Sequence, residues 1–434
     1  MASFHVGIIG GGIGGLCLAQ GLKKAGINVT LFERDRTRSD RLQGYRVHID
    51  PSGSGALKAC LPAELYALFV ATCGKSNGGF RVLTEQLDEL IRFNVESDPD
   101  RVDSHKSVSR ITLREVLLSG LEGIVEFDKT FTRFEQRASG KIAAFFEDGS
   151  SSEFDILVGA DGGNSRVRKQ FLPHAQRIDT GVRGIAGKVA LIEEHRRELN
   201  PKLLASPALV LAPQPFSLFI AKQEFRQRPT SGDDRIDGVA GGNLPPGLLF
   251  DDTQDYVMWA FGGRWATLGL PDEASYPSGA ALETIVLDRI AKWHPDFRRL
   301  VELSDPATLS LFPIRTAAAV APWPTERITL IGDAIHSMTP YRGIGANIAL
   351  RDASLLCRNL ELAEAGHLSA IEAIHRYETA MIRYGFKAVR VSLEAMEQAV
   401  AEKRMGFVVQ KAGLRVLNAL PPLKRWALAR RSGD

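Results

Sequence analysis

A glycine-rich turn near the amino terminus limits this chain to a small set of folds. The apolar residues 4–9 lead into Gly10, Gly12 and Gly15, spaced as GxGxxG, and a helix-forming stretch follows to about Ala25. In such a turn the first glycine permits the sharp bend, the second lets a pyrophosphate approach the backbone, and the third lets the helix pack on the strand. The order of strand, glycine turn and helix therefore predicts a βαβ unit that binds a dinucleotide.

The acidic residue that a dinucleotide site requires follows the next predicted strand, residues 28–32, at Glu33. A carboxylate there accepts hydrogen bonds from ribose hydroxyls and would repel a 2′-phosphate, so the turn fits FAD or NAD and not NADP. A purely structural glycine turn is the alternative, and Glu33 at the expected distance counts against it. No second GxGxxG occurs downstream, which indicates a nicotinamide reductant that visits without a Rossmann domain of its own.

A second constrained stretch, residues 328–352, has the pattern of a short buried strand, a loop rich in glycine and proline, and a helix. Asp333 stands directly after the strand, where ligands of α/β sheets lie. Pro340 prevents the loop from continuing as helix or strand, and Gly343 and Gly345 let backbone amides approach a flat ligand. The unpaired N–H groups at the start of the helix suit a ring that becomes anionic on reduction. A reduced flavin is such a ring.

The two stretches, in this order, resemble the FAD fingerprints of the flavoprotein aromatic hydroxylases, the group A monooxygenases typified by p-hydroxybenzoate hydroxylase. Ile335 and Ile344 depart from the residues common in that family without changing the backbone chemistry. The resemblance, over roughly residues 4–352, implies an enzyme of secondary metabolism. Such an enzyme uses FAD, NADPH or NADH, and O2 to hydroxylate or epoxidise an aromatic or polycyclic small molecule through a flavin hydroperoxide.

Two other functions stay open at this point. A reductase or dehydrogenase of the same fold would also bind FAD, but would act on a prenyl or polyketide substrate without consuming oxygen. A non-enzymatic flavin-binding protein would not accelerate NAD(P)H oxidation. The sequence has no Ser/His/Asp or Cys/His nucleophile arrangement and no metal-ligand cluster, so no catalytic residue and no metal ligand is assigned. His336, inside the second fingerprint, is expected to be a structural hydrogen-bonding residue.

The resemblance also implies which residues contact FAD. Asp333 would meet the ribityl or pyrophosphate part, and the loop from Pro340 to Asn347 would lie along the isoalloxazine. Arg110 leads a helix similar to the family's RxxL helix, whose first Arg reaches the pyrophosphate, and Asp161 heads a similar DG turn. The implied cofactor-binding residues are Gly10, Gly12, Ile13, Gly14, Gly15, Glu33, Arg34, Arg110, Asp161, Asp333, Pro340, Gly343, Gly345, Ala346 and Asn347.

Three further residues near these motifs could have either a structural or a ligand-binding role. Arg46 and His48 could meet the flavin or the phosphate of an incoming nicotinamide, and the alternation around them suits an ordinary half-exposed strand equally well. Arg168 follows the Asp161 turn, and both residues are expected mainly to hold that turn together. Neither Asp161 nor Arg168 is expected to be catalytic.

Four regions are expected along the chain. Residues 1–176 and 297–366 form the two parts of a Rossmann-type FAD-binding domain, residues 177–296 an inserted substrate domain, and residues 367–434 a C-terminal helical region. The aperiodic segment 231–255 is interpreted as a surface insertion in preference to a lid. The expected fold class is therefore α/β with an inserted, largely antiparallel sheet, whose predicted strands are residues 182–192, 208–211, 217–221, 256–261 and 265–270.

Composition excludes several classes of function. A chain of 434 residues with 44% hydrophobic content can bury a large core. A net charge of +3 argues against nucleic-acid binding, and no apolar run reaches membrane-spanning length. A first strand at about residue 4 leaves no room for a cleavable leader, so a cytoplasmic protein is expected. The cysteines lack a CxxC pair, which indicates neither a zinc site nor a disulfide framework; they are Cys17, Cys60, Cys73 and Cys357.

The C-terminal segment is basic and amphipathic. Residues 403–431 carry eight Lys or Arg and no Asp or Glu, interleaved with apolar residues. Such a segment can lie on an anionic membrane. Packing against the protein's own body is the commoner arrangement and is the one we expect. The partners that the family resemblance implies are a small aromatic substrate and O2.

Overall fold

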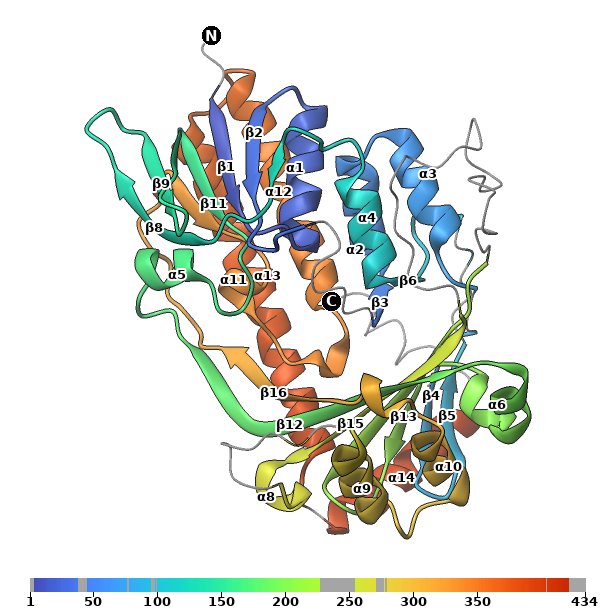
Figure 1. Ribbon diagram of the computed structural model, residues 1–434. Coiled ribbons are helices and arrows are strands. Elements are labelled where there is room, and N and C mark those ends of the chain that lie inside the picture. Colours follow the sequence, from blue (N-terminus) through green and yellow to red (C-terminus); the bar gives the residue numbers. More distant parts are fainter. Residues whose placement is uncertain are drawn as a thin grey trace.

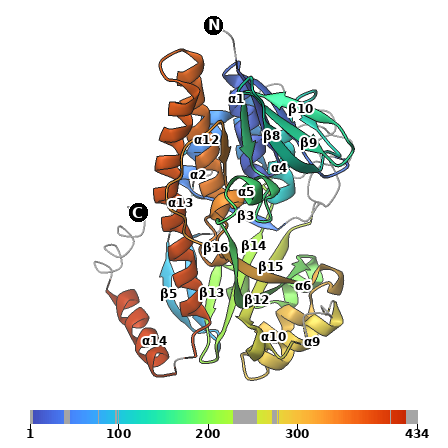
Figure 2. The same cartoon turned by 90° about the vertical axis from the view of Figure 1, so that its left-hand side faces the viewer.

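The structure is a computed structural model that describes residues 4–37, 45–75, 78–94, 98, 100–226, 254–270, 277, 279–402 and 404–420. Two sheets divide the molecule, a parallel sheet of five strands in the upper half of Figure 1 and a seven-stranded sheet in the lower half. The long strand β12 (Arg177–Ala190) and the long helix α13 (Ala370–Ala399) reach from one half to the other (Figures 1 and 2).

The upper sheet is parallel, with the strand order β17-β11-β1-β2-β7. Near-continuous apolar runs such as HVGII and ILVG form its strands because layers of the protein cover both faces. On one of these faces, Phe154 lies so close to Gly7 that a side chain on Gly7 would overlap its ring. The strands are β1 (His5–Ile9), β2 (Asn28–Phe32), β7 (Val125–Glu126), β11 (Ile156–Gly159) and β17 (Ile328–Leu330).

Phe154 belongs to a small antiparallel sheet, and helices cover the opposite face of the parallel sheet (Figure 2). The antiparallel strands are β8 (Phe131–Gln136), β9 (Ile142–Phe146) and β10 (Ser151–Phe154), and a separate ribbon pairs β3 (Arg46–Ile49) with β6 (Lys106–Ser109). The helices of this half are α1 (Ile13–Lys24), α2 (Pro51–Cys60), α3 (Ala63–Thr72), α4 (Arg110–Leu118), α5 (Arg166–Phe171), α11 (Asp333–His336), the short η2 (Pro340–Arg342) and α12 (Gly345–Glu364).

The lower sheet has the order β16-β12-β15-β14-β13-β4-β5 and is antiparallel except where β13 meets β4. Its outer face carries a second core under short helices, with Trp259, Phe261 and Phe297 fully buried. Besides β12, the strands are β4 (Phe80–Thr84), β5 (Glu89–Phe93), β13 (Ala208–Leu211), β14 (Phe216–Gln223), β15 (Tyr256–Arg264) and β16 (Ser310–Ala317). The helices are α6 (Glu193–Glu198), α7 (Pro201–Leu204), α8 (Trp265–Leu268), α9 (Ala280–Arg289), α10 (Pro295–Glu302) and η1 (Pro306–Thr308).

The lower sheet is larger than the sequence predicted. Strands β4, β5 and β16 lie outside the range 177–296 and still belong to this sheet: β4 pairs with β13, β5 with β4, and β16 with β12. Local periodicity identifies a strand without identifying the sheet that it joins. The strands predicted at 208–211, 217–221 and 256–261 are confirmed as β13, β14 and β15. The strand predicted at 265–270 is wrong: its first residues form α8, which ends at Gly269 with φ 64°. Of the segment 231–255, only residues 254 and 255 are described.

The last described helix, α14 (Arg404–Ala419), packs on the lower half of the molecule. Leu414 and Leu417 lie against the apolar side chains of β4 and β5, in agreement with the expectation that this segment covers the protein's own body. Residues 421–434 lie outside the described part of the chain. Among the described residues, no helix has the length and apolar character needed to cross a membrane.

Gly21 allows three helices of the upper half to pack closely. A Cβ built on Gly21 in α1 would lie 2.8 Å from Sγ of Cys357 in α12 and 3.2 Å from Sγ of Cys60 in α2. Glycine in a helix interior costs about 1 kcal/mol relative to alanine. This position is filled by neighbouring sulfur atoms, which explains why the sequence retains glycine there.

We expect Gly21→Ala to lower the free energy of unfolding. Overpacking a buried site costs about 1–3 kcal/mol, which outweighs the gain in helix propensity of about 1 kcal/mol. Gly55→Ala is the matched control, because Gly55 in α2 has no atom within 4 Å of the added methyl group, and it should stabilise the protein. Chemical denaturation measures both variants, and a Gly21→Ala protein as stable as Gly55→Ala would contradict this packing.

Glu378 is a buried carboxyl group where α13 packs on the parallel sheet. It is 3% exposed, and its oxygens accept hydrogen bonds from Oγ1 of Thr329 at 2.9 Å, Oγ1 of Thr325 at 2.8 Å and Nε1 of Trp323 at 3.2 Å. Burial raises the pKa of Glu378 from an ordinary value of 4.5 to about 7, although these hydrogen bonds oppose the shift. The folded protein therefore holds a proton here that the unfolded chain releases.

Because the folded-state pKa is raised, the contribution of Glu378 to stability is full below about pH 4.5 and is lost as the pH rises through about 7. Glu378→Gln removes this titration. Between about pH 4.5 and pH 7 the unfolding free energy of the variant should therefore fall by roughly 1–3 kcal/mol less than that of the wild-type protein. Urea unfolding at a series of pH values measures the effect. Glu394→Gln, at an exposed position of the same helix, should leave the profile unchanged; equal profiles for both variants would refute the assignment.

Candidate functional site

The carboxyl edge of the upper sheet gathers the three sequence motifs. Strands β1, β11 and β17 are parallel neighbours, so Gly10, Asp161 and Asp333, which follow their ends, emerge at the same edge. The backbones are in contact, because a Cβ on Gly10 would lie 2.4 Å from the carbonyl oxygen of Ala160. This edge faces the lower half of the molecule (Figure 1), and ligands of open α/β sheets bind at such an edge.

The glycine turn leaves the start of α1 accessible. Gly10 has φ 112°, and a Cβ on Gly15 would lie 2.1 Å from the Gly10 carbonyl oxygen, so neither position tolerates a side chain. Gly12, in contrast, has no atom within 4 Å of the position of its missing Cβ. Helix α1 begins at Ile13 without a side-chain cap and without an acidic residue in its first turn. Its first N–H groups can therefore bind an anionic group such as a phosphate.

The start of α12 brings the two fingerprints together. A Cβ on Gly14 in α1 would lie 3.3 Å from Cβ of Ala349 in α12, and a Cβ on Gly332 would lie 3.0 Å from the same atom. Gly332 has φ 60°, a left-handed conformation that favours glycine. Two segments more than 300 positions apart in the sequence thus form one continuous wall of the site.

Glu33 supports the glycine turn at the end of β2. Its Oε2 accepts a hydrogen bond from the N–H of Gly11 at 2.5 Å, and its Oε1 accepts one from the N–H of Asp35 at 3.0 Å. The side chain is 8% exposed. The carboxylate predicted to bind a ribose therefore fixes the glycine turn. Arg34, the next residue, is exposed.

Asp161 and Arg168 mainly stabilise the DG turn, as the sequence predicted. Asp161 Oδ2 accepts hydrogen bonds from the N–H groups of Arg166 at 2.7 Å and Val167 at 3.3 Å, while its Oδ1 is buried without a partner among the described residues. Burial raises the pKa of Asp161, although these hydrogen bonds oppose the shift. Arg168 Nη1 donates to the carbonyl oxygen of Ala334 at 2.7 Å, which connects the DG turn to the second fingerprint.

Asp352 organises the second fingerprint, a role that the sequence analysis missed. This carboxylate is fully buried. Its Oδ2 accepts hydrogen bonds from the N–H of Gly332 at 2.7 Å and from Nε2 of His336 at 2.6 Å, and its Oδ1 accepts one from the Tyr384 hydroxyl at 2.5 Å. His336 is therefore a structural residue, as expected. The sequence feature that could have identified Asp352 is its position on the apolar face of α12, between Leu350 and Leu356.

The loop before α12 has exposed backbone at the carboxyl edge of the upper sheet. Pro340 and Gly343 are exposed, Gly343 has φ 62°, and Gly345 and Ala346 are half-buried at the start of the helix. Asn347 differs, because its side chain is 1% exposed. Asn347 Oδ1 accepts a hydrogen bond from the N–H of Asp50 and Nδ2 donates to the carbonyl oxygen of His48, both at 2.9 Å. Its amide fixes the first turn of α12 to the segment 48–50.

The Asp333 carboxylate lies close enough to Arg177 to act on its charge. Asp333 is exposed at the first position of α11. Burial lowers the pKa of Arg177, and the nearby Asp333 carboxylate opposes the shift. Arg177 Nη1 donates to Oδ1 of Asn164 at 3.3 Å. The sequence analysis did not single out Arg177, which carries no local signal because it is the first residue of β12.

The other basic residues predicted near the cofactor have different surroundings. Arg110 is exposed at the first position of α4. Arg46 Nε donates to Oγ of Ser107 at 2.6 Å, which fixes it to the neighbouring strand. Nε2 of His48 lies 3.1 Å from Nδ1 of His105, and burial, with the charge of Arg46, lowers the pKa of His48 to about 3. His48 is therefore neutral at physiological pH and belongs to an ordinary strand pair.

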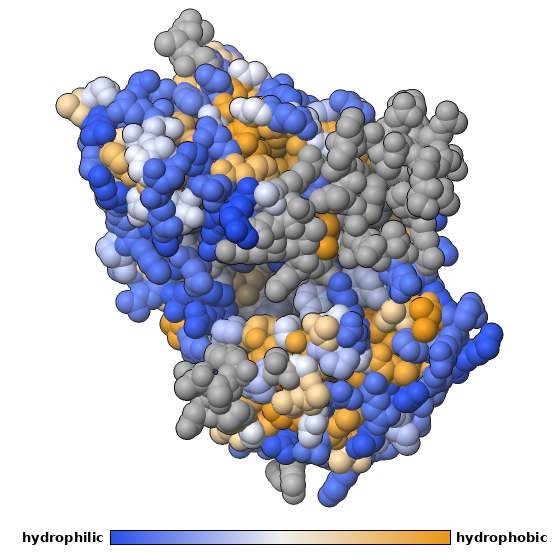
Figure 3. Space-filling model, viewed as in Figure 1, coloured by the Kyte–Doolittle hydropathy of each residue, from blue (hydrophilic) through white to orange (hydrophobic). Residues whose placement is uncertain are grey.

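The face of the lower sheet that is turned toward the upper half carries small residues, of which Gly184 lies under the Phe312 ring and Gly262 under the Tyr341 hydroxyl. The register pairs Gly184 with Gly262 and Ala186 with Ala260 on one face, while the alternate residues enter the second core on the other face. The Tyr341 hydroxyl, from the loop before α12, lies 3.1 Å from Oγ of Ser217 on the same face. The second fingerprint therefore touches the lower sheet directly, and Figure 3 shows the surface recessed between the two halves.

The residues present fit an extended dinucleotide such as FAD. The N-termini of α1 and α12 reach one edge without side-chain caps, and such termini attract phosphates and an anionic ring. Gly12 leaves room for the ligand backbone, and the buried Asp161 Oδ1 can accept a hydrogen bond from it. Within the described residues, no group of His, Cys, Asp and Glu could hold a metal ion.

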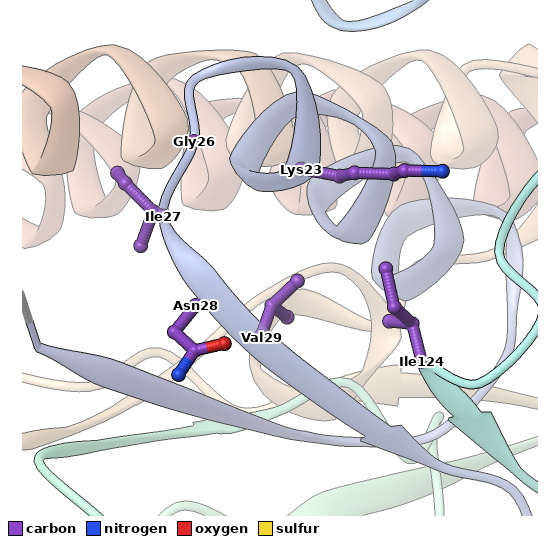
Figure 4. Close-up of a pocket in the computed structure, with 6 residues that line it drawn as sticks. All are labelled: Lys23, Gly26, Ile27, Asn28, Val29 and Ile124. Atoms are coloured by element: carbon purple, nitrogen blue, oxygen red, sulfur yellow. The ribbon is translucent and has the colours of Figure 1, made fainter.

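A separate cavity of about 310 Å³ lies at the opposite end of the parallel sheet (Figure 4). Asn28, the first residue of β2, lines it together with Lys23 and Ile124. Because this cavity adjoins the amino ends of the strands, it lies away from the glycine turn and is not part of the dinucleotide site.

Two family models match this chain. A model described as an FAD binding domain matches residues 290–392, and one described as an NAD(P)-binding Rossmann-like domain matches residues 8–53. A crystal structure from Photorhabdus luminescens subsp. laumondii TTO1, studied as a FAD-containing monooxygenase, is 36% identical. It matches with a TM-score of 0.80 over 92% of this chain and 99% of that chain.

Other relatives are named as hydroxylases or as FAD-dependent monooxygenases. Salicylate hydroxylase of Pseudomonas putida is 26% identical over 387 residues, covering 85% of this chain and 80% of the hydroxylase. A dual O-methyltransferase/FAD-dependent monooxygenase of Phaeosphaeria nodorum is 30% identical over 416 residues, covering 88% of this chain and 42% of that protein. The chain spans under half the length of this relative and of two similar dual enzymes from Cercospora.

The Photorhabdus protein is 36% identical to this chain over nearly the full length of both, and the fold and both fingerprints agree with that likeness. This chain therefore belongs to the FAD-dependent monooxygenases, in the aromatic hydroxylase family.

Proposed function

We propose that this protein takes electrons from NADPH or NADH and transfers one oxygen atom of O2 to an aromatic or polycyclic small molecule, by hydroxylation or epoxidation. The observation that carries the proposal is the convergence of the glycine turn, Asp333 and the start of α12 at one sheet edge. Two relatives are named for aromatic substrates, the salicylate hydroxylase of Pseudomonas putida and the urate hydroxylase of Klebsiella oxytoca.

In this proposal the upper half holds FAD in an extended form. The start of α1, from Gly10 to Gly15, binds the pyrophosphate, because its N–H groups have no side-chain cap. Glu33 and Arg34 lie toward the adenosine ribose. Arg110 and Asp161 contribute from the neighbouring segments, and Asp333 lies toward the ribityl chain. Pro340, Gly343, Gly345, Ala346 and the backbone of Asn347 line the isoalloxazine.

The lower sheet places the substrate in this proposal. Bound FAD supplies the electron transfer and the activation of oxygen. A planar ring can lie beside the cofactor against Ala260, which is half-buried on this face. The Phe312 ring, which covers Gly184, and the Tyr341 hydroxyl, which covers Gly262, would bound this position. Burial raises the pKa of Tyr341 to about 12, so its hydroxyl stays protonated. That hydroxyl is held by Ser217 and can position a polar substituent of the ring.

A screen of phenols, quinones and polycyclic aromatics for stimulation of NAD(P)H oxidation tests the proposal. We expect at least one compound to accelerate NAD(P)H and O2 consumption together and to gain the mass of one oxygen atom. An oxygen electrode and mass spectrometry of the products measure this. A product formed without O2 consumption would show a reductase or dehydrogenase instead, and no stimulation by any compound would favour a non-enzymatic flavin-binding protein.

Glu33→Gln should weaken FAD binding by about 10- to 100-fold, because a hydrogen bond to a charged group contributes about 1.5–3 kcal/mol. The amide keeps only one acceptor oxygen, so the N–H of Gly11 or of Asp35 loses its partner. Titration of the apoprotein by flavin fluorescence measures the affinity. Glu126→Gln is the control, an exposed carboxylate at the end of the adjacent strand β7, and it should bind FAD normally. Wild-type affinity in folded Glu33→Gln would rule out this role.

A further inference from the structure

The face of the lower sheet that carries Ala260 continues, away from the loop before α12, to a charged residue. Met258 follows Ala260 on this face, and the register places Lys188 of β12 beside Met258. All three side chains are half-buried. The Tyr341 hydroxyl covers Gly262, four residues from Met258 along β15, which is roughly 13 Å in a strand. One end of this face thus meets the loop before α12, and the other end carries an ammonium group.

Two tyrosine rings fix the position of the Lys188 ammonium group. Its Nζ lies 4.5 Å from the centre of the Tyr256 ring and 5.3 Å from the centre of the Tyr45 ring. Tyr256 lies on the same face at the start of β15, whereas Tyr45 directly precedes β3 in the upper half. The Tyr45 hydroxyl donates to the carbonyl oxygen of Thr308 at 3.2 Å. The ammonium group is therefore held between the two halves of the molecule.

A second cation approaches Tyr256 from the upper half. Arg46 lies in β3, on the side of this half that is turned toward the lower sheet (Figure 1). Its Nε donates to Oγ of Ser107 at 2.6 Å, and Oγ of Ser107 donates to Oε1 of Gln223 at 2.5 Å. Gln223 pairs with Tyr256 in the lower sheet, and Tyr256 is close enough to Arg46 to act on its charge. Lys188 and Arg46 therefore converge on one tyrosine from different halves.

Two cations beside aromatic rings and an apolar surface are chemically suited to an aromatic carboxylate. Guanidinium and ammonium groups bind carboxylates through charge-assisted hydrogen bonds, and the attraction is stronger where water is partly excluded. Phe219, which pairs with Ala260, adds half-buried apolar surface beside Met258. Because the cations lie at the far end of this face from Tyr341, a ligand that reaches both ends must extend over more than one ring.

We propose that Lys188 and Arg46 form an anion-binding subsite, and that the substrate is a fused-ring aromatic acid. This inference rests on the proposed function, because it extends the substrate position beside Ala260. The carboxylate of the substrate binds Lys188 and Arg46, and its rings lie on Met258 and Ala260. The end of the substrate remote from the carboxylate then points toward the loop before α12, so that Lys188 determines which molecules bind and in which direction.

Two other roles for Lys188 predict different results. If it only links the two halves through its tyrosine rings, its loss lowers the stability without changing the preference between acidic and neutral ligands. If it binds a phosphate group of NADPH or NADH, its loss weakens nicotinamide binding and leaves the binding of aromatic acids unchanged.

The test titrates the full-length, FAD-loaded protein with 6-hydroxy-2-naphthoate and with the uncharged 6-hydroxy-2-naphthamide, without NAD(P)H. The change in the flavin absorption spectrum gives both dissociation constants. We expect the acid to bind at least about tenfold more tightly than the amide, because only the acid gains charge-assisted hydrogen bonds. The single-ring 4-hydroxybenzoate should bind more weakly than the naphthoate. Since no reductant is present, a failure of oxygen transfer would not affect these results.

Substitutions of Lys188 separate its charge from its packing. Lys188→Met keeps the apolar stem and should weaken naphthoate binding by about 10- to 100-fold, with naphthamide binding unchanged. Lys188→Arg should retain the preference for the acid. Lys222→Met is the matched control, because Lys222 is also half-buried in the lower sheet but lies on the opposite face, with its Nζ 2.7 Å from Oε2 of Glu224. It should bind both naphthalene probes as the wild-type protein does.

Several results would overturn the proposal. In the wild-type protein these are equal affinity for the acid and the amide, or equal affinity for 4-hydroxybenzoate and the naphthoate. In folded Lys188→Met they are an unchanged preference for the acid, or weaker binding of NADPH or NADH with unchanged binding of the naphthoate. Circular dichroism and the bound flavin content verify that each variant is folded, and the two wild-type comparisons are decisive even if a variant does not fold.

Discussion

The parallel pairing of β1, β11 and β17 is the constraint on which the rest of the structure depends. Backbone hydrogen bonds align these strands, so the turns that follow them must emerge at one edge although they are distant in the sequence. Gly10 fits against the next turn because it has no side chain. Asp352 fixes the last turn by accepting the N–H of Gly332. A disturbance of either contact would move one of these turns away from the shared edge.

The same geometry explains which parts of the site could be predicted from the sequence. Gly10, Glu33 and Asp333 act through backbone conformation and position at strand ends, which are local properties that leave a readable spacing. Asp352 acts through contacts with residues of other elements, and the sequence contains no spacing rule for such contacts. Asn347 was expected at the end of the loop, whereas it lies in the first turn of α12 and its amide holds the segment 48–50. The partners of a side chain are less predictable than its location.

The fold of the lower half was predicted less completely, for a related reason. Strand periodicity predicted β13, β14 and β15, whereas the sheet also includes β4 and β5 from far upstream and β16 from downstream. Pairing between distant segments depends on tertiary contacts such as the buried Arg81, whose Nε donates to Oγ of Ser206. These contacts complete the lower sheet, and the Tyr341 to Ser217 contact joins it to the loop before α12.

The central claim is that one FAD molecule spans the carboxyl edge of the upper sheet, between the glycine turn and the start of α12. A crystal structure of the protein saturated with FAD tests this most directly. We expect continuous density with the pyrophosphate at Gly12 and the isoalloxazine beside Gly343 and Gly345. Density for FAD at any other place, or none in crystals grown with excess FAD, would contradict it.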